Sequence, residues 1–162
     1  MVVAVSSPPP HPEMVPVPLL PDNREQVTSP ESAYQIVSML HGVVERGTGV
    51  KLRVIGKPLG GKTGTTNDFI DAWFVGFAPD LAVGVYTGFD EPASMGRSEA
   101  GSAVAVPIFR DFMKEALADK KAIPFRVPSG LRLVRIDGKT GRIARPGDKG
   151  VILEAFKPEN AP

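Results

Sequence analysis

The chain contains no cysteine and only two histidines among its 162 residues, and this scarcity excludes several kinds of chemistry. Without thiols the protein forms no disulfide, has no thiolate nucleophile and offers no cysteine ligands for zinc. The two histidines, His11 and His41, are too few to indicate a metal centre. We therefore predict neither a bound metal nor a cofactor, while the missing cysteine leaves the cellular compartment open.

Long apolar runs and an excess of charge are lacking as well. The longest apolar run, at residues 72–79, is far shorter than the roughly 20 residues that span a bilayer, and the first residues lack the basic flank of a signal peptide. There are 19 basic and 18 acidic residues, and the net charge of +1 gives no sign of a nucleic-acid-binding surface. The sequence thus predicts no membrane segment, no targeting or anchor segment and no nucleic-acid partner for this chain.

Glycine and proline are abundant instead, with 17 of each. Eight prolines lie within the first 30 residues, where their fixed φ and missing N–H oppose both a helix and a central strand. We expect residues 1–28 to form a Pro-rich linker or loop, residues 29–122 to form the main folded part, and residues 123–162 to form a small β appendage with a tail.

Hydrophobic spacing indicates a fold of the α/β class, α+β type, in which helices pack on an antiparallel sheet of about three strands. Ser29 is a good N-cap for a helix over Pro30–Arg46, whose apolar residues recur every three or four positions. A second helical pattern covers 102–117 and contains Pro107, so this helix either begins or is kinked there. The expected core face of the first helix consists of Ala33, Ile36, Val37, Leu40, Val43 and Val44.

Strands are expected on both sides of a glycine-rich break at Gly56–Gly61. The turn residues Ala78-Pro79-Asp80 separate two apolar, partly alternating runs and indicate a β-hairpin, with Trp73 in its core. The expected strands are, in chain order, 52–55, 72–77, 81–89 and a second, small hairpin around Asp137-Gly138.

The stretch after this break satisfies two different motifs. Residues Gly56–Thr63 fit G-x-x-x-x-G-K-[ST], the P-loop that binds nucleotide phosphates in front of a helix. Lys62-Thr63-Gly64 is the triplet of penicillin-binding proteins and serine β-lactamases. A P-loop leads straight into a helix, but Gly64 and the paired threonines after it make a poor first helical turn. A strand is therefore favoured, and a nucleotide-binding domain stays an alternative.

A strand gives the triplet a suitable chemistry. Side chains alternate along a strand, so Lys62 and Gly64 share one face while Thr63 and Thr65 share the other. A lysine ammonium beside two hydroxyl groups is a good receptor for a carboxylate, and glycine leaves room for a substrate backbone to approach. One triplet alone is weak evidence, because Lys139-Thr140-Gly141 repeats it where we predict only an exposed turn.

Far more than the triplet resembles one known family. The segments that carry the resemblance are Lys62-Thr63-Gly64-Thr65-Thr66, Asp71–Phe77, Gly84–Asp90 and the helical stretches at 32–40 and 101–113. They resemble the C-terminal half of the transpeptidase domain of class A penicillin-binding proteins, strongly over 27–128. The resemblance implies part of the fold shared with serine β-lactamases, and residues 29–122 would be the C-terminal portion of that domain. It also implies a peptidoglycan D,D-transpeptidase that penicillins acylate.

The resemblance assigns roles to the residues of the triplet. It implies that Lys62 and Thr63 bind the terminal carboxylate of a D-Ala-D-Ala stem peptide or of a β-lactam, with Gly64 giving clearance and Thr65 adding its hydroxyl. The backbone N–H of Thr65 would be one of two oxyanion-hole donors. In the full-length family this chemistry takes place at the periplasmic face of the bacterial inner membrane. Two further residues are expected at the rim of the same cleft, Gly101 and Ser102.

The nucleophile motifs of the family are absent from this chain. None of its nine serines is followed by lysine three residues on or by asparagine two residues on, so neither Ser-x-x-Lys nor Ser-x-Asn is present. We therefore expect a fragment that is inactive alone, that partners the remainder of the transpeptidase polypeptide, and that exposes apolar faces and self-associates. The alternatives are the P-loop domain and a non-catalytic module that binds stem peptide.

Overall fold

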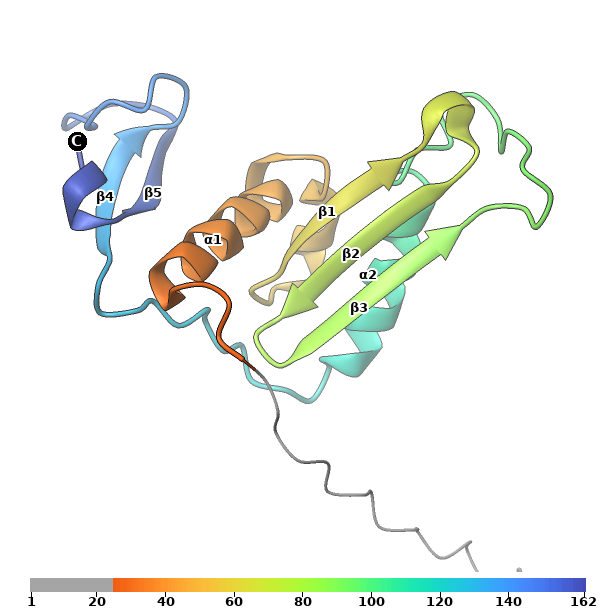
Figure 1. Cartoon of the computed structure of the whole chain (residues 1–162), viewed down its shortest axis with the longest axis horizontal. Coiled ribbons are helices and arrows are strands. Elements are labelled where there is room, and N and C mark those ends of the chain that lie inside the picture. Colours follow the sequence, from red (N-terminus) through yellow and green to blue (C-terminus); the bar gives the residue numbers. More distant parts are fainter. Residues whose placement is uncertain (1–24) are drawn as a thin grey trace, which may run out of the picture.

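The computed structural model describes residues 25–162, so most of the linker or loop expected for residues 1–28 lies outside the described part. No helix in this part is both long enough and apolar enough to cross a membrane. The helices and strands (Figure 1) are α1 (Pro30–Arg46), β1 (Gly60–Thr65), β2 (Ala72–Ala78), β3 (Leu81–Thr87), α2 (Ala105–Ala116), β4 (Arg132–Asp137) and β5 (Val151–Phe156).

The first three strands form one antiparallel sheet in the order β1-β2-β3. Its register places Lys62 of β1 opposite Val75 of β2, and Val75 opposite Gly84 of β3. This confirms the strand expected for the Lys-Thr-Gly triplet and the hairpin across Ala78-Pro79-Asp80. The glycine-rich break is shorter than expected, because β1 already begins at Gly60.

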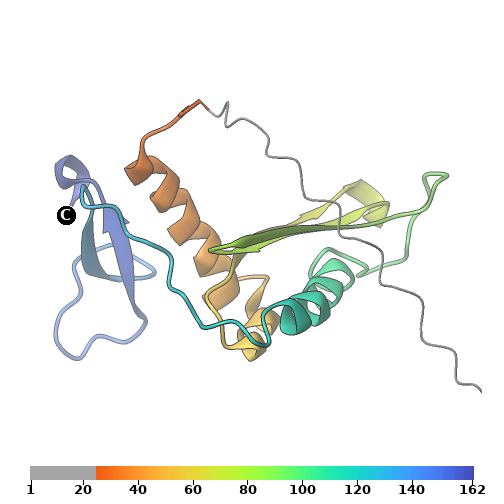
Figure 2. The same ribbon diagram turned by 90° about the horizontal axis from the view of Figure 1, so that it is seen from below.

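Helix α2 covers one face of this sheet. Alternate residues of β2 point toward the helix, so Phe74 is buried while Trp73 and Val75 lie on the opposite face. The Phe74 ring meets the ring of Phe109 edge-on, with centroids 4.8 Å apart, and Met113 is fully buried beside them. Removing each such side chain from water contributes about 1.5–3 kcal/mol. Seen edge-on, the sheet has α2 below it, and no helix of the described part lies over the opposite face of β2 and β3 (Figure 2).

The start of α2 resolves the question posed by the proline in its sequence. The helix begins at Ala105, two residues before Pro107, and is preceded by a turn in which the Val104 N–H donates to the Ala100 carbonyl at 3.0 Å. Pro107 therefore lies in the first helical turn, where a backbone N–H has no intrahelical partner in any case.

Helix α1 has the predicted bounds but not the predicted buried face. Its N-cap Ser29 accepts a hydrogen bond from the Ser32 N–H, and Pro30 occupies the first helical position. Of the expected core face, Val44 is buried while Ile36 is 55% exposed. The reason is that only the C-terminal part of α1 lies against β1, where the His41 ring bonds the carbonyl just before the strand.

Two further expectations are wrong. The stretch expected as a short strand is a 3-10 turn, Val50–Ile55, in which the Leu52 N–H donates to the Gly49 carbonyl and the Leu52 side chain is fully buried. Gly56 ends the turn in the left-handed region, with φ of 68°. Trp73 is 44% exposed and lies outside the core, because it projects from the uncovered face of the sheet.

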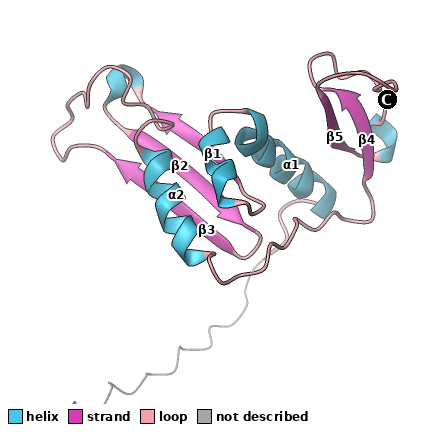
Figure 3. Cartoon of the chain, turned by 180° about the vertical axis from the view of Figure 1, so that it is seen from behind, coloured by secondary structure: helices cyan, strands magenta, loops and turns pink. Residues whose placement is uncertain are grey.

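The C-terminal hairpin of β4 and β5 packs against α1, on the side away from the large sheet (Figure 3). The Ser38 hydroxyl donates to the Glu154 carboxylate at 3.1 Å, and the Gln35 amide donates to the Ala155 carbonyl at 3.0 Å. Arg46 lies 3.9 Å from the same carboxylate. The small hairpin expected around Asp137-Gly138 is thus part of a larger one, whose strands are joined by a long connection.

Candidate functional site

The Lys-Thr-Gly triplet lies on β1, an edge strand of the described sheet. The pattern of hydrogen bonds along β1 follows from its last pair, because the Thr66 N–H donates to the Asp71 carbonyl at 3.1 Å. Antiparallel strands alternate between pairs that exchange hydrogen bonds and pairs that do not. In the observed register, Gly64 and Lys62 are therefore bonded to β2, and the backbone N–H and C=O groups of Thr63 and Thr65 face the free edge of β1.

The charged side chain of the triplet reaches that free edge. Lys62 is exposed, and its ammonium donates to the Thr63 carbonyl at 2.7 Å, although its Cβ lies on the face of the sheet opposite α2. Among residues 25–162 no carboxylate lies within ion-pair distance of this ammonium. The arrangement presents a positive charge and outward-facing backbone groups along one edge, which suits an extended anionic ligand.

The hydroxyl groups of Thr63 and Thr65 project on the other face and each has a protein partner. The Thr63 hydroxyl lies 3.1 Å from the hydroxyl of Thr48, in the turn that follows α1. The Thr65 hydroxyl accepts a hydrogen bond from the Gly101 N–H at 3.1 Å. Sequence analysis missed Thr48; its position between two glycines at the end of a predicted helix was the available signal.

Gly101, which the sequence analysis expects near the rim of the site, lies directly on the backbone of the sheet. A Cβ built on Gly101 would be 2.4 Å from the Trp73 carbonyl oxygen and 2.7 Å from that of Gly64. Any side chain at this position would therefore push the 100–104 turn away from β1 and lengthen its hydrogen bond to Thr65. Ser102, the other residue expected there, follows it in the same turn and is half-buried.

The loop from β1 to β2 begins at the end of the same strand and contains strained backbone. Asp68 and Phe69 both have positive φ, 58° and 56°, a region that bulky residues rarely occupy. The Ser94 hydroxyl donates to the Asp68 carbonyl at 2.6 Å, and the Met95 N–H donates to the Phe69 carbonyl at 2.9 Å. These bonds from a distant loop hold the strained turn in place next to Thr65.

An aromatic pair lies on the uncovered face beside the triplet, and the sequence did not predict it. Trp73 is paired with Gly64 in the register, and its ring lies 4.7 Å from that of Tyr86. The Tyr86 hydroxyl donates to the Asp71 carboxylate at 2.9 Å. This hydrogen bond to an anion raises the pKa of Tyr86, and desolvation adds to the effect.

The structure does not support the P-loop alternative. A P-loop needs a helix directly after its lysine and threonine, so that the helix N-terminus faces the phosphates. Here Lys62 and Thr63 lie inside β1, and the strand continues to Thr65. The next residues form a three-residue 3-10 turn, Asn67–Phe69, which leads into β2.

The second triplet, Lys139-Thr140-Gly141, is the exposed turn that the sequence predicts. The Asp137 carboxylate accepts hydrogen bonds from the Thr140 N–H and hydroxyl and from the Lys139 N–H. These donors, led by the Thr140 N–H, hold the pKa of Asp137 below its usual range. The same three residue types thus form a capped turn in one place and a strand edge in the other.

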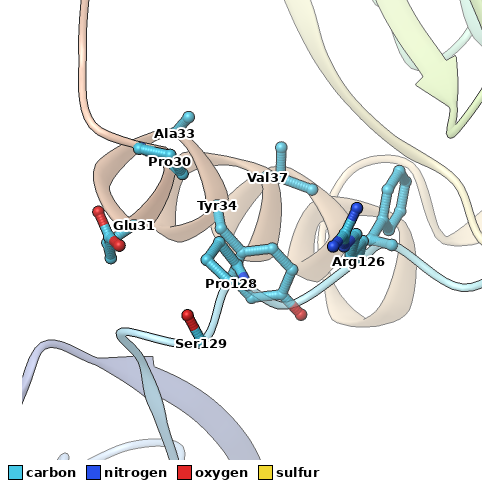
Figure 4. A pocket seen from close by; sticks show the side chains of 9 residues that line it. Pro30, Glu31, Ala33, Tyr34, Val37, Arg126, Pro128 and Ser129 are labelled. Carbon is cyan, nitrogen blue, oxygen red and sulfur yellow. The ribbon is translucent and has the colours of Figure 1, made fainter.

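Two other candidates lie outside the triplet. Glu45 follows His41 by four residues on α1, but the two do not pair. The His41 ring bonds the Leu59 carbonyl at 2.7 Å, and Glu45 lies 3.8 Å from Arg53. A shallow hollow of about 600 Å³ lies between the first turns of α1 and the segment leading to β4, and its lining includes Tyr34 (Figure 4). No residue of β1 lines this hollow.

Comparison with known proteins gives consistent matches. Residues 14–114 match the family described as penicillin binding protein transpeptidase domain. The chain is 49% identical over 135 residues to penicillin-binding protein 1A of Rickettsia conorii, covering 83% of this chain and 17% of that protein. It is 43% identical over 143 residues to penicillin-binding protein 1A of Pseudomonas aeruginosa, covering 88% of this chain and 17% of the relative.

The fold matches as well. A crystal structure of penicillin-binding protein 1A from Haemophilus influenzae aligns with a TM-score of 0.74 and 34% sequence identity, over 84% of this chain and 21% of that one. With 17% of their length covered, the chain spans about a sixth of the curated relatives it matches.

Proposed function

The chain belongs to the penicillin-binding protein transpeptidase family, and from this premise we propose that β1 is the strand that binds the substrate carboxylate. The ligand is the terminal carboxylate of a D-Ala-D-Ala stem peptide, or that of a β-lactam. The observation that carries this proposal is the free edge of β1, where the Lys62 ammonium lies beside the outward-facing backbone of Thr63 and Thr65.

The proposed chemistry is acyl transfer. A serine oxygen attacks the carbonyl carbon of the penultimate D-Ala, the peptide bond breaks, and the terminal D-Ala leaves with a proton on its nitrogen. A stem-peptide amine then attacks the acyl-enzyme and releases the serine. We propose that the N–H of Thr65 donates to the oxyanion of each tetrahedral intermediate, a contact worth about 2.7–4 kcal/mol in other enzymes. Its outward direction at the free edge of β1 supports this role.

We further propose that this chain does not form the acyl-enzyme by itself. None of its nine serines has a lysine three residues on, which leaves each without the base that would take its proton in this family's mechanism. The serine would then come from the remainder of the transpeptidase polypeptide, working at the periplasmic face of the inner membrane. The exposed aromatic pair Trp73 and Tyr86, on the face of the sheet that carries Lys62, offers an apolar surface for that partner.

Two measurements on the purified chain test the proposal. Incubation with a fluorescent penicillin, followed by denaturing electrophoresis, is expected to leave the chain unlabelled. Titration of the ¹⁵N-labelled chain with N-acetyl-D-Ala-D-Ala is expected to give weak, saturable shifts centred on β1 that are lost in Lys62→Ala. Lys139→Ala, the same change in the second triplet, is the matched control and should bind like the unchanged chain.

The two measurements separate the parts of the proposal. A covalent penicillin label on this chain would refute its dependence on another polypeptide. Peptide binding that survives Lys62→Ala, or that is lost equally in Lys139→Ala, would show that β1 is not the carboxylate site. Binding without labelling, in contrast, agrees with both parts.

A further inference from the structure

We infer that Thr48 is a positioning residue that directs the hydroxyl proton of Thr63 toward the bound carboxylate. This inference rests on the proposed function of β1 and names a residue outside the triplet. It is based on the number of protons available, because a threonine hydroxyl carries one proton and can donate only one hydrogen bond. A hydroxyl that donates to the protein has no proton left for an anion.

For Thr65, a backbone N–H on the side away from the free edge decides which way its hydroxyl bonds. Its hydroxyl is bonded to the Gly101 N–H, and a backbone N–H can only donate. The Thr65 oxygen therefore accepts in this bond, and its own proton stays available. The close packing of Gly101 on the sheet backbone fixes the direction from which the donor comes.

Thr63 lies two residues earlier on the same face of β1 and has a different partner. The Thr48 and Thr63 hydroxyl oxygens lie 3.1 Å apart, and by geometry either one can be the donor. A carboxylate at the free edge has no proton to give, so a bond between it and Thr63 requires Thr63 to donate. Thr48 must then donate to Thr63, and the pair of hydroxyls forms a chain that ends on the anion.

The turn that carries Thr48 is itself held by backbone bonds. The N–H groups of Gly47 and Gly49 both donate to the Val43 carbonyl, at 3.1 and 3.0 Å, at the C-terminus of α1. Gly49 is buried, and a Cβ there would lie 3.3 Å from the same carbonyl. Thr48 is thus an exposed side chain on a fixed backbone, as a positioning role requires.

The test compares two ligands on variants of the ¹⁵N-labelled chain. The ligands are N-acetyl-D-Ala-D-Ala and the same dipeptide with a C-terminal amide, which lacks the carboxylate. Thr48→Val, which keeps the shape but removes the donor, is expected to weaken binding of the acid about two- to tenfold. Binding of the amide should not change, and Thr48→Ser should restore the affinity for the acid. Three-bond couplings of Thr63 report whether its χ1 stays in one rotamer.

The controls keep the outcome interpretable. Thr140→Val removes a hydroxyl from the second triplet and should leave both affinities unchanged. Thr48→Ala serves as a second truncation, and an unchanged amide spectrum of β1–β3 shows that each variant is folded.

Several results would overturn the inference. These are an unchanged affinity of Thr48→Val for the acid, an equal loss for acid and amide, or a failure of Thr48→Ser to restore binding. If Lys62→Ala loses binding while Thr48→Val does not, only this inference fails. If the unchanged chain binds no dipeptide, or Lys62→Ala binds normally, the proposed function fails and this inference fails with it.

Discussion

Gly76, at the centre of the sheet, is enclosed by two aromatic rings. A Cβ built on it would lie 2.6 Å from a ring carbon of Phe74 and 2.7 Å from one of Phe109. Both rings are fully buried and pack edge-on against each other, so neither has free space to move into. Gly84 on β3 is a natural contrast, since a Cβ there has only Val75 within reach, at 4.0 Å.

We therefore predict that Gly76→Ala lowers the free energy of unfolding by about 1–3 kcal/mol, the usual cost of overpacking a core. Gly84→Ala, in the same sheet and also with an ordinary backbone conformation, should be neutral or slightly stabilising. Urea unfolding followed by Trp73 fluorescence measures both. Equal effects of the two substitutions would show that the rings do not set the constraint.

Single residues differ in how far the sequence predicted them. Lys62, Thr63 and Thr65 could be predicted as site residues because the triplet and its flanks match a known pattern, and their binding role stays a prediction. Thr48 could not, because its bond to Thr63 joins a turn and a strand that only the folded chain brings together. Trp73 was misplaced because a hydrophobic side chain is expected inside, and nothing local indicates that one face of the sheet is uncovered.

At the level of elements, the C-terminal hairpin makes its polar contacts with α1 mainly through one carboxylate, that of Glu154. Glu154 accepts from the Ser38 hydroxyl and lies near Arg46, and its side chain is 20% exposed. In the described part of the chain, the only other side-chain hydrogen bond across this contact runs from the Gln35 amide to the Ala155 carbonyl and does not involve a charge. The hairpin therefore has few polar bonds to the helix in the described part of the chain.

We predict that Glu154→Ala loosens the hairpin by about 1 kcal/mol without unfolding the three-stranded sheet, because charged hydrogen bonds at a partly exposed site are worth about that much. Hydrogen–deuterium exchange should become faster in β4 and β5 and stay unchanged in β2 and β3. Glu159→Ala, at an exposed position nearby, is the control. Faster exchange throughout the sheet would contradict this independence.

Elements were predicted well where local chemistry decides them. Ser29 and Pro30 mark the start of α1, and Ala78-Pro79-Asp80 marks the hairpin, so both were placed from sequence. A strand was expected over 52–55, which lies within the 3-10 turn Val50–Ile55. Four residues with apolar ends fit either state, and only the burial of Leu52 in the core decides between them.

An uncovered apolar surface characterises the molecule as a whole. The face of the sheet opposite α2 exposes three large side chains, Trp73, Val75 and Tyr86, by 44%, 53% and 51%. Such contiguous apolar groups on one face favour contact with another surface. The sequence anticipated uncovered apolar faces, but the identity of this face follows only from the register and from the side that α2 covers.

We predict that the isolated chain self-associates through this face at concentrations of tens of micromolar, because burying the three side chains gains free energy at about 25 cal/mol per Å². Sedimentation velocity over a dilution series should show a rising average mass. The double substitution Trp73→Thr/Val75→Thr should reduce it, and Ile143→Thr, an equally exposed change on the hairpin loop, should not. A single monomeric species at all concentrations would rule the prediction out.

The ring of Phe74 restricts which amino-acid substitutions the neighbouring strands can accept during evolution. The same side chain blocks a Cβ at Gly61, at 2.6 Å, and at Gly76, also at 2.6 Å. Shortening Phe74 removes one close contact at each glycine, but a Cβ would still lie 2.8 Å from the Val75 carbonyl oxygen at Gly61 and 2.7 Å from the Phe109 ring at Gly76. Substitutions at these three positions are therefore epistatic, because the cost of enlarging either glycine depends on the side chain at position 74, and the other close contacts keep both positions restrictive when that side chain is small.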